Sequence, residues 1–353
     1  MFIPKDIKLG RFLVGSNHEP FIIAEMSGNH GQSLDNALKL VEIAAKAGVQ
    51  ALKLQTYTAE TMTLDLHVGD FVINDPKSLW NGRSLFELYE EAHTPWEWHK
   101  PIFEKARELG LECFSTPFDK TAVDFLEEIG CSFYKIASFE NTDHELLKAV
   151  ARTGKPIIMS TGTTYLDELV QSVDVLRQNG CEDLILLKCT STYPADPKDS
   201  NLLTIPHMKE LFRCHIGLSD HTLGIGVPLA SIPLGSVVIE KHFTMSRADE
   251  TVDSAFSLEP DELKALVDES TRVSLALGKI SYQPQPKELN SRHFKRSLFI
   301  VKDVKAGEVL TEECVRSIRP GTGLPIRYLK DVIGCRLTKN ATKGMPVTFD
   351  LFR

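Results

Sequence analysis

Charged side chains at the ends of two apolar runs are the residues of this chain best placed to do chemistry. Glu25 lies near the end of the run 21–26, and Lys53 lies within the run 51–55, where it shares a strand face with Gln55. An amphipathic helical pattern over residues 33–47 separates the two runs, which predicts a strand–helix–strand unit. Because α/β folds carry their chemistry at the carboxyl ends of parallel strands, we expect these three side chains to belong to a functional site.

A second interior lysine indicates what that site binds. Lys135 lies in the apolar run 133–137, and a buried lysine is costly without a partner. Lys53 and Lys135 together predict a phosphate or carboxylate site. Hydroxyl groups near other strand ends could complete it, namely those of Thr116, Ser138, Ser160, Ser191 and Ser219. An alternative stays open, in which Lys53 pairs with Glu25 as an ion pair of the core.

Two histidines follow neighbouring strands and predict a metal site. His221 ends the segment 217–221, and His242 lies near the end of the run 237–243. Adjacent parallel strands would bring both imidazoles within reach of one ion. Two nitrogens plus water or substrate oxygens suit Mn²⁺, Co²⁺ or Mg²⁺ better than a closed zinc site. The alternative is a pair of ordinary polar histidines.

Other polar residues are interpreted by their positions. Tyr193 continues the alternation of Cys189 and Ser191, so it joins the set expected at strand ends. Asp253 lies in the loop after the last run, where it is either a substrate contact or a plain turn acid. The remaining histidines on loops or helix faces are expected to be solvated: His67, His93, His99 and His207.

The elements that must position these residues alternate regularly. Eight strand-like runs are separated by helical patterns: 21–26, 51–55, 111–116, 133–137, 156–161, 184–190, 215–219 and 237–243. This order predicts an α/β fold, a (β/α)8 TIM barrel with the polar strand ends at its mouth. The longest connection, residues 56–82, is expected to form a lid or an irregular hairpin over that mouth.

The pattern changes after the last long helix. Gly278, Pro284 and Pro286 follow one another closely, which is typical of a linker. We place the barrel domain at 1–282, the linker at 283–294 and a small β-rich domain at 295–353. Its short strands are expected at 297–301, 305–307, 319–323 and 337–344. A domain of this length buries only a small hydrophobic core, so we expect it to pack against a larger partner.

Composition excludes several classes of protein. The 353 residues are 42% hydrophobic and carry a formal net charge of −8, which does not suggest nucleic-acid binding. We expect no transmembrane helix, no membrane partner and no signal peptide, because no apolar run is long enough. Seven scattered cysteines without CxxC spacing predict reduced thiols in a cytoplasmic protein.

The motifs around the candidate residues resemble the sialic acid synthase family. They follow in order along nearly the whole chain: 23–25 (IAE), 28–30 (GNH), 51–55 (ALKLQ), 115–119 (STPFD), 134–138 (YKIAS), 217–222 (GLSDHT) and 240–244 (EKHFT). The segment 319–323 (RPGTG) is similar to that family's antifreeze-like (SAF) domain. Within the family, residues 25–30 and 53–58 look most like the pseudaminic acid synthase branch.

The resemblance implies a condensation of phosphoenolpyruvate with an acylamino aldose and water, here a diacetamido-trideoxy hexose. It would yield a nine-carbon 2-keto acid and phosphate, with a divalent metal such as Mn²⁺, Mg²⁺ or Co²⁺ as cofactor. Lys53, Lys135 and the hydroxyl groups would bind phosphoenolpyruvate, and His221 and His242 the metal. The resemblance implies contact with the sugar or proton handling for Glu25, Gln55, Tyr193 and Asp253.

The resemblance also implies a domain-swapped homodimer in which Arg319 of one protomer reaches the barrel of the other. One position departs from the pattern, because the neuraminate branch typically has asparagine where Ser191 stands. Serine keeps a donor but has a shorter reach, so its contact with phosphate is the least supported of the set.

Three other functions stay open at this stage. The first is the same chemistry on another sugar, giving N-acetylneuraminate or legionaminate. The second is a metal-dependent pyruvate aldolase, in which Lys53 or Lys135 could form a Schiff base and no phosphate would be released. The third is a carbohydrate-binding protein with a degenerate barrel. The intact set of charged residues and histidines argues against the third.

Overall fold

Parallel strands that close into a barrel form the centre of the first of two structural units. The computed structural model describes residues 3–76 and 78–352. The units are Met1–Gly278 and Lys279–Arg353. Within the described part, the barrel has eight strands in the order β10-β3-β4-β5-β6-β7-β8-β9. They are β3 (Phe21–Glu25), β4 (Ala51–Thr56), β5 (Glu112–Pro117), β6 (Tyr134–Ile136), β7 (Ile157–Ser160), β8 (Leu184–Cys189), β9 (His215–Asp220) and β10 (Ser236–His242). The TIM-barrel prediction is therefore confirmed.

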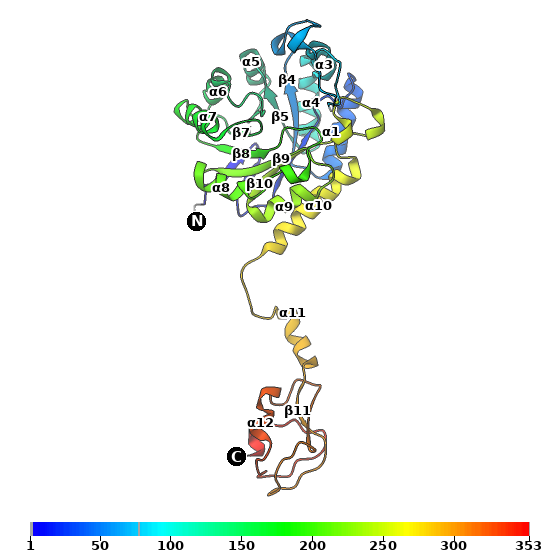
Figure 1. Cartoon of the computed structure of the whole chain (residues 1–353), viewed down its shortest axis with the longest axis vertical. Helices are drawn as coiled ribbons and strands as arrows, with labels where there is room; N and C mark the ends of the chain where they lie inside the picture. Colours follow the sequence, from blue (N-terminus) through cyan, green and yellow to red (C-terminus); the bar gives the residue numbers. More distant parts are fainter. Residues whose placement is uncertain (1–2, 77, 353) are drawn as a thin grey trace. The chain divides into compact units, whose positions relative to one another are not determined.

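Helices surround this barrel, as Figure 1 shows. The principal ones are α1 (Leu34–Ala47), α4 (Trp96–Glu108), α5 (Lys120–Glu128), α6 (His144–Ala151), α7 (Leu166–Gln178), α8 (Thr204–Phe212), α9 (Gly226–Ser231) and α10 (Pro260–Leu277). Helix α1 shows how the sequence sets their bounds. The Ser33 hydroxyl accepts a hydrogen bond from the Asn36 amide, and Gly48 ends the helix at φ 89°, a conformation that glycine adopts without strain.

The strand register brings the polar strand ends to one level. Glu25 is paired with Lys53 across β3 and β4, and with His242 across β3 and β10. Ser219 is paired with Glu240 across β9 and β10. Because side chains of parallel strands alternate between lumen and helices, these neighbours form a ring of polar groups inside the barrel mouth.

Two features lie at the ends of the barrel. An antiparallel hairpin, β1 (Ile7–Leu9) and β2 (Phe12–Val14), precedes β3 and was not predicted. The connection from 56 to 82 contains α2 (Ala59–Met62) and a bridge between Val72 and Ser84, before α3 (Leu85–Ala92). The predicted irregular hairpin is therefore present, apart from residue 77, which lies outside the described residues.

The second unit contains little regular structure. Its antiparallel strands are β11 (Ser297–Ile300) and β12 (Val315–Ile318), and its helices are α11 (Pro286–Leu289) and α12 (Leu329–Val332). Strands predicted at 305–307, 319–323 and 337–344 do not form. The chain there makes only isolated bridges, such as Val304–Ala341, which are too short to show a periodic pattern. Residues 283–294, predicted as a linker, include α11 and a 3₁₀ turn.

Neither unit offers a membrane span among the residues that the structure describes, since none of their helices is both long and apolar enough to cross a bilayer.

Candidate active site

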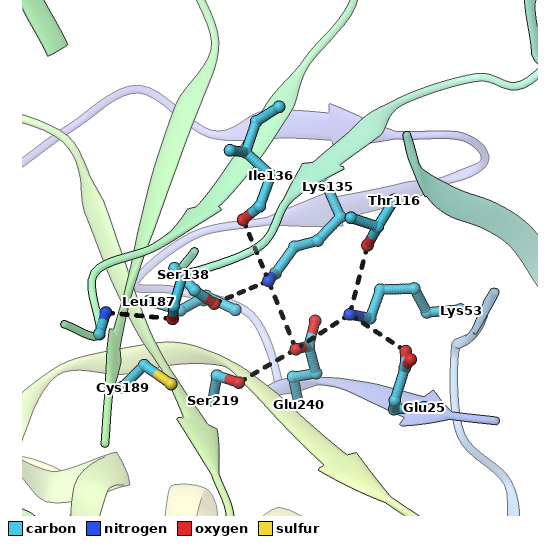
Figure 2. Close-up of polar contacts among 12 residues, drawn as sticks. Glu25, Lys53, Thr116, Lys135, Ile136, Ser138, Leu187, Cys189, Ser219 and Glu240 are labelled. Carbon is cyan, nitrogen blue, oxygen red and sulfur yellow. Dashed lines mark hydrogen bonds and ion pairs between the residues drawn. The ribbon is translucent and has the colours of Figure 1, made fainter. Parts of the chain in front are cut away.

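Four buried charged side chains form a chain of ion pairs in the barrel lumen (Figure 2). The Lys53 ammonium lies 3.1 Å from Oε2 of Glu25 and 3.2 Å from Oε1 of Glu240. The Lys135 ammonium lies 3.5 Å from the same oxygen of Glu240. The core ion pair left open by the sequence is thus present, and Glu240, which sequence reasoning did not select, is its centre.

The packing beneath these charges explains why they are shielded from water. The rings of Phe21, Phe114 and Phe133 fill the lumen below. The Phe133 centroid lies 6.4 Å from that of Phe21 and 4.3 Å from that of Phe114. Lys53, Lys135, Glu25 and Glu240 are each no more than 4% exposed. An apolar floor with a charged layer above it means that each charge depends on its partners for stabilisation.

The two glutamates differ in how burial is compensated. Burial raises the pKa of Glu25 to about 7, an effect that the neighbouring Lys53 only partly offsets. Burial also acts on Glu240, but Lys135 and Lys53 together lower its pKa to about 2. Glu240 is therefore a fixed negative charge, whereas Glu25 can exchange a proton near neutral pH, as a general acid or base must.

The Lys135 ammonium faces a group of hydroxyls that could bind an anion. Its Nζ donates to Oγ of Ser160 at 2.7 Å, and burial lowers its pKa. The amide of Gly162 donates to the Ser138 hydroxyl at 3.1 Å. A Cβ at Gly162 would meet Oγ of Ser191 at 2.1 Å and Oγ of Ser138 at 2.7 Å, so only glycine leaves this cradle open. Sequence reasoning missed Gly162, because a loop glycine carries no distinctive signal.

Thr116 and Ser219 contact two other members of the charged chain, Lys53 and Glu240. The Lys53 ammonium donates to Oγ1 of Thr116 at 3.5 Å, and the Ser219 hydroxyl donates to Oε1 of Glu240 at 3.0 Å. The structure therefore brings two of the predicted hydroxyls, Thr116 and Ser160, into direct contact with the lysines, and Ser219 reaches them through Glu240. Ser138 and Ser191 lie at Gly162 instead, and the Ser191 hydroxyl is 3.6 Å from the Cys189 sulfur.

The two predicted metal-binding histidines are neighbours, with ring centroids 5.3 Å apart. Nδ1 of His221 donates to the Thr190 carbonyl at 2.9 Å. Burial lowers the pKa of this ring, but the neighbouring Cys189 raises it by more. Burial, followed by the positive charges around it, lowers the pKa of His242 well below its usual value. A neutral imidazole is the form that binds a metal.

The donor set fits an open metal site rather than a closed one. Nδ1 of His242 is buried without a hydrogen-bond partner, and the nearest carboxylate oxygen is that of Asp253 at 3.8 Å. Among the described residues, no group of three or more His, Cys, Asp and Glu side chains is placed to hold an ion. Two imidazoles would therefore share an ion with water or substrate oxygens.

Aromatic rings line the mouth beside these histidines. The Tyr193 ring lies 4.4 Å from His221 and 5.2 Å from Phe256, centroid to centroid. Trp80, from the long connection after β4, lies 5.9 Å from Tyr193, and its indole nitrogen donates to the Val252 carbonyl at 3.1 Å. The connection therefore reaches the mouth, as expected, and Phe256 and Trp80 are contacts that the sequence did not reveal.

Gln55 and Asp253 complete the mouth. Nε2 of Gln55 donates to Oε1 of Glu25 at 2.9 Å. Asp253 is 7% exposed and accepts a hydrogen bond from the Ser27 hydroxyl, so it is not a plain turn acid. Arg319, in contrast, belongs to the second unit, where it is exposed directly after β12.

One histidine was wrongly interpreted. His99 was expected to be solvated, but its side chain is fully buried in α4. Its Nε2 lies 2.8 Å from Oγ1 of Thr56, and burial lowers its pKa to about 4. The helical pattern does not show the hydroxyl that satisfies this ring from a neighbouring strand.

The architecture and the site are those of a barrel enzyme whose mouth gathers lysines, hydroxyls and two histidines, and comparison with known proteins names its family. Residues 40–282 match the NeuB family, and residues 295–353 match the SAF domain. The chain belongs to the NeuB family of sialic acid synthases, which confirms the resemblance drawn from the motifs.

Individual relatives refine that membership. The chain is 43% identical to a pseudaminic acid synthase of Campylobacter jejuni, over 96% of this chain and 97% of that protein. It is 41% identical to the pseudaminic acid synthase of Helicobacter pylori, over 94% and 97%. Against the N,N'-diacetyllegionaminic acid synthase of Campylobacter jejuni the identity is 34%, over 90% and 96%.

A solved structure agrees with the fold. The N-acetylneuraminic acid synthetase of Leptospira borgpetersenii, in complex with citrate, is 33% identical and superposes with a TM-score of 0.73. The match covers 82% of this chain and 96% of that one.

Proposed function

We propose that this chain is a pseudaminic acid synthase, a transferase that condenses phosphoenolpyruvate with 2,4-diacetamido-2,4,6-trideoxy-β-L-altropyranose and water. The products are pseudaminic acid and phosphate, formed by cleavage of the C–O bond of phosphoenolpyruvate. The observation that carries the choice of sugar is the identity of 43% to a pseudaminic acid synthase over almost the whole chain, against 34% to a legionaminic acid synthase.

The lumen supports the reaction class independently of that choice. Phosphoenolpyruvate carries a phosphate and a carboxylate, and the mouth presents two ammonium groups beside serine and threonine hydroxyls. Lys135, with a single carboxylate at 3.5 Å, is the less neutralised of the two lysines. An anion seated against Lys135 and the Gly162 cradle would supply the missing charge.

A divalent ion would be held by Nε2 of His221 together with the unpaired ring nitrogen of His242. When bound, such an ion polarises the open-chain aldehyde of the sugar as a Lewis acid. Asp253 lies beside His242 and would orient the sugar at the same edge of the mouth.

The protein residues then act on the condensation in turn. The enol carbon of phosphoenolpyruvate attacks the aldehyde carbon, whose π electrons pass to the aldehyde oxygen. That oxygen takes up a proton to become a hydroxyl group of the product, and positive charge develops at the carbon that bears the phosphate. The Glu25 carboxylate, held by Gln55 and Lys53, faces this centre and stabilises that charge. Water adds to the same carbon, and Glu25 accepts a proton from it, as a carboxyl with a pKa of about 7 is suited to do.

The tetrahedral intermediate collapses with breakage of its carbon–oxygen bond to phosphate. Negative charge grows on the leaving phosphate, where Lys135 and the hydroxyl groups stabilise it. Glu240, a fixed anion between the two lysines, holds both ammonium groups in place through the cycle.

The second unit contributes Arg319 in this proposal. It would enter the barrel mouth of the partner protomer in a domain-swapped homodimer and bind an acidic or acetamido group of the substrates. Its exposure in its own unit leaves its guanidinium free of competing carboxylates among the described residues.

Phosphate release from phosphoenolpyruvate with Mn²⁺ tests the assignment. The altrose derivative is compared with N-acetylmannosamine and with the diacetamido precursor of legionaminic acid. Release with the altrose derivative alone is expected, and release with another sugar alone would move the chain to that branch. Pyruvate-dependent condensation without phosphate, and trapping of a lysine by borohydride, would instead identify an aldolase.

A further inference from the structure

Ser27 joins the two halves of the barrel mouth. Its hydroxyl is held between Gln55, which orients Glu25, and Asp253, which lies beside His242. We infer that Ser27 is a positioning residue that keeps the Glu25–Gln55 pair in register with Asp253 and His242 for the condensation. The inference rests on the proposed function, in which those residues act on different substrates.

The hydrogen bonds run in one direction through Ser27. Nε2 of Gln55 has two hydrogens, one donated to Oε1 of Glu25 at 2.9 Å and one to Oγ of Ser27 at 3.1 Å. The Ser27 hydroxyl donates its own hydrogen to Oδ2 of Asp253. That oxygen lies 3.8 Å from Nδ1 of His242. A continuous set of contacts therefore runs from the proposed proton-accepting group to the metal-binding edge.

This series of hydrogen bonds is suited to hold side chains in position rather than to transfer protons. An amide nitrogen keeps both of its hydrogens, so no proton passes from Glu25 through Gln55 to the serine. Each acceptor in the chain has a defined donor, which fixes the rotamers of Gln55 and Asp253. Removal of the serine oxygen would leave Asp253 with one donor fewer and Gln55 with an unused hydrogen.

The backbone gives a second, independent reason. Ser27 has φ 48°, in the left-handed region that favours glycine. The other non-glycine residues with positive φ in the described part of the chain are exposed, and Ser27 alone is buried, at 4%. Glycine would adopt this conformation more easily. The hydrogen bonds of the serine hydroxyl are therefore the reason we give for a serine at this strained position.

Comparison of Ser27→Gly with Ser27→Ala separates the hydroxyl from the backbone. Both variants remove the hydroxyl, but only glycine relieves the left-handed conformation. We expect Ser27→Gly to melt no lower than the wild type and Ser27→Ala to melt lower. In both, kcat should fall by about ten-fold or more, because small misplacements of reacting groups are costly.

The Michaelis constant for phosphoenolpyruvate distinguishes a loss of positioning from a general structural defect, because a structural defect would change this constant as well. Ser27 contacts neither lysine, so this constant should stay within about two-fold while kcat falls. The matched control is Arg213→Gly, at the C-terminus of α8, which relieves a left-handed φ of 53° away from the mouth. It should keep full turnover.

Binding of Mn²⁺ supplies a readout that needs no turnover. Because Asp253 lies beside His242, loss of its serine donor should weaken Mn²⁺ binding by about ten-fold. Wild-type kcat in Ser27→Gly would overturn the inference. So would equal losses of melting temperature in both Ser27 variants with kcat falling in proportion. If the wild type releases no phosphate, the proposed function fails. Unchanged Mn²⁺ binding in Ser27→Gly would then overturn this inference separately.

Discussion

Two lysine–glutamate pairs, one in each unit, show how strongly burial decides what an ion pair does. In the second unit, Lys302 Nζ lies 2.8 Å from Oε2 of Glu313, with side chains 60% and 79% exposed. In the barrel, Lys53 Nζ lies 3.2 Å from Oε1 of Glu240, with side chains 5% and 4% exposed. The shorter contact is the weaker one, because water screens it and solvates either partner alone.

The buried pair cannot be broken without consequence. Loss of one partner would leave an uncompensated charge above the apolar floor of the lumen. The same shielding strengthens the field of the lysines at a bound anion, so stability and chemistry depend on the same side chains. The second unit stabilises itself by a small apolar cluster that includes Leu298, Ile300 and Val347, and its charges stay on the surface.

The largest effect is expected from Lys53→Met. It removes an ammonium that faces both Glu25 and Glu240, so phosphate release should fall by about a thousand-fold or more. The two buried carboxylates then repel each other, and the free energy of unfolding should fall by about 3–5 kcal/mol. Denaturant unfolding and a coupled phosphate assay measure the two losses. Turnover near the wild-type rate would contradict the role given to this lysine.

The next effect tests the exchange of second units between protomers. Arg319→Ala should leave the melting curve unchanged, because the side chain is exposed, yet lower turnover by about a hundred-fold. Arg319→Ala and Lys53→Met are then mixed in equal amounts and refolded together. If the units are swapped, a mixed dimer pairs the intact barrel of the Arg319→Ala chain with the intact Arg319 of the Lys53→Met chain. Activity should then recover to about a quarter of the wild type. No recovery from the mixture would contradict the swap.

A smaller effect concerns pH and distinguishes the two glutamates of the lumen. The pKa of Glu25 is raised from 4.5 to about 7, so the folded protein holds this proton more tightly than the unfolded chain. Glu25 therefore contributes up to about 3 kcal/mol to the free energy of unfolding at low pH, and this contribution is lost as pH rises from about 4.5 to 7. Glu25→Gln should lack this decline.

Unfolding of the wild type and of Glu25→Gln at pH 5 and pH 7.5 measures the difference. Glu240, with its pKa lowered to about 2, acts in the opposite direction, and its contribution is lost only as pH falls below about 4.5. A wild-type stability that rises relative to Glu25→Gln between pH 5 and pH 7.5 would contradict the raised pKa of Glu25.

The smallest effect is expected at the exposed pair. Lys302→Met removes the shorter of the two contacts compared above, and neither the melting temperature nor turnover should change measurably. A loss of stability comparable to that of Lys53→Met would show that burial is not what separates the two pairs.

The barrel could be predicted from sequence far better than the second unit. Its strands are continuous apolar runs, because both faces are buried, and the observed bounds of β5 and β8 differ from the predicted ones by one residue. In the second unit, the strand at 315–318 was missed. Its residues alternate in exposure over only four positions, and partners such as Val304 and Ala341 meet through single bridges.

The site was predicted in part for a similar reason. Strand alternation identifies Glu25, Lys53 and Lys135, because charge is rare inside an apolar strand. The same alternation places Glu240 on the lumen face with His242, and Lys241, which points the other way, pairs with Asp220. Ser27 and Phe256 come from loops, whose course no periodic pattern reveals.

The reaction itself is tested most directly by running it in water enriched in ¹⁸O and measuring the mass of the phosphate released. Cleavage of the C–O bond of phosphoenolpyruvate keeps all four phosphate oxygens from the substrate. The account predicts unlabelled phosphate, formed only when the diacetamido altrose is present. Phosphate carrying one ¹⁸O would mean attack of water on phosphorus, and phosphate released without the sugar would mean simple hydrolysis. Either result would contradict the condensation.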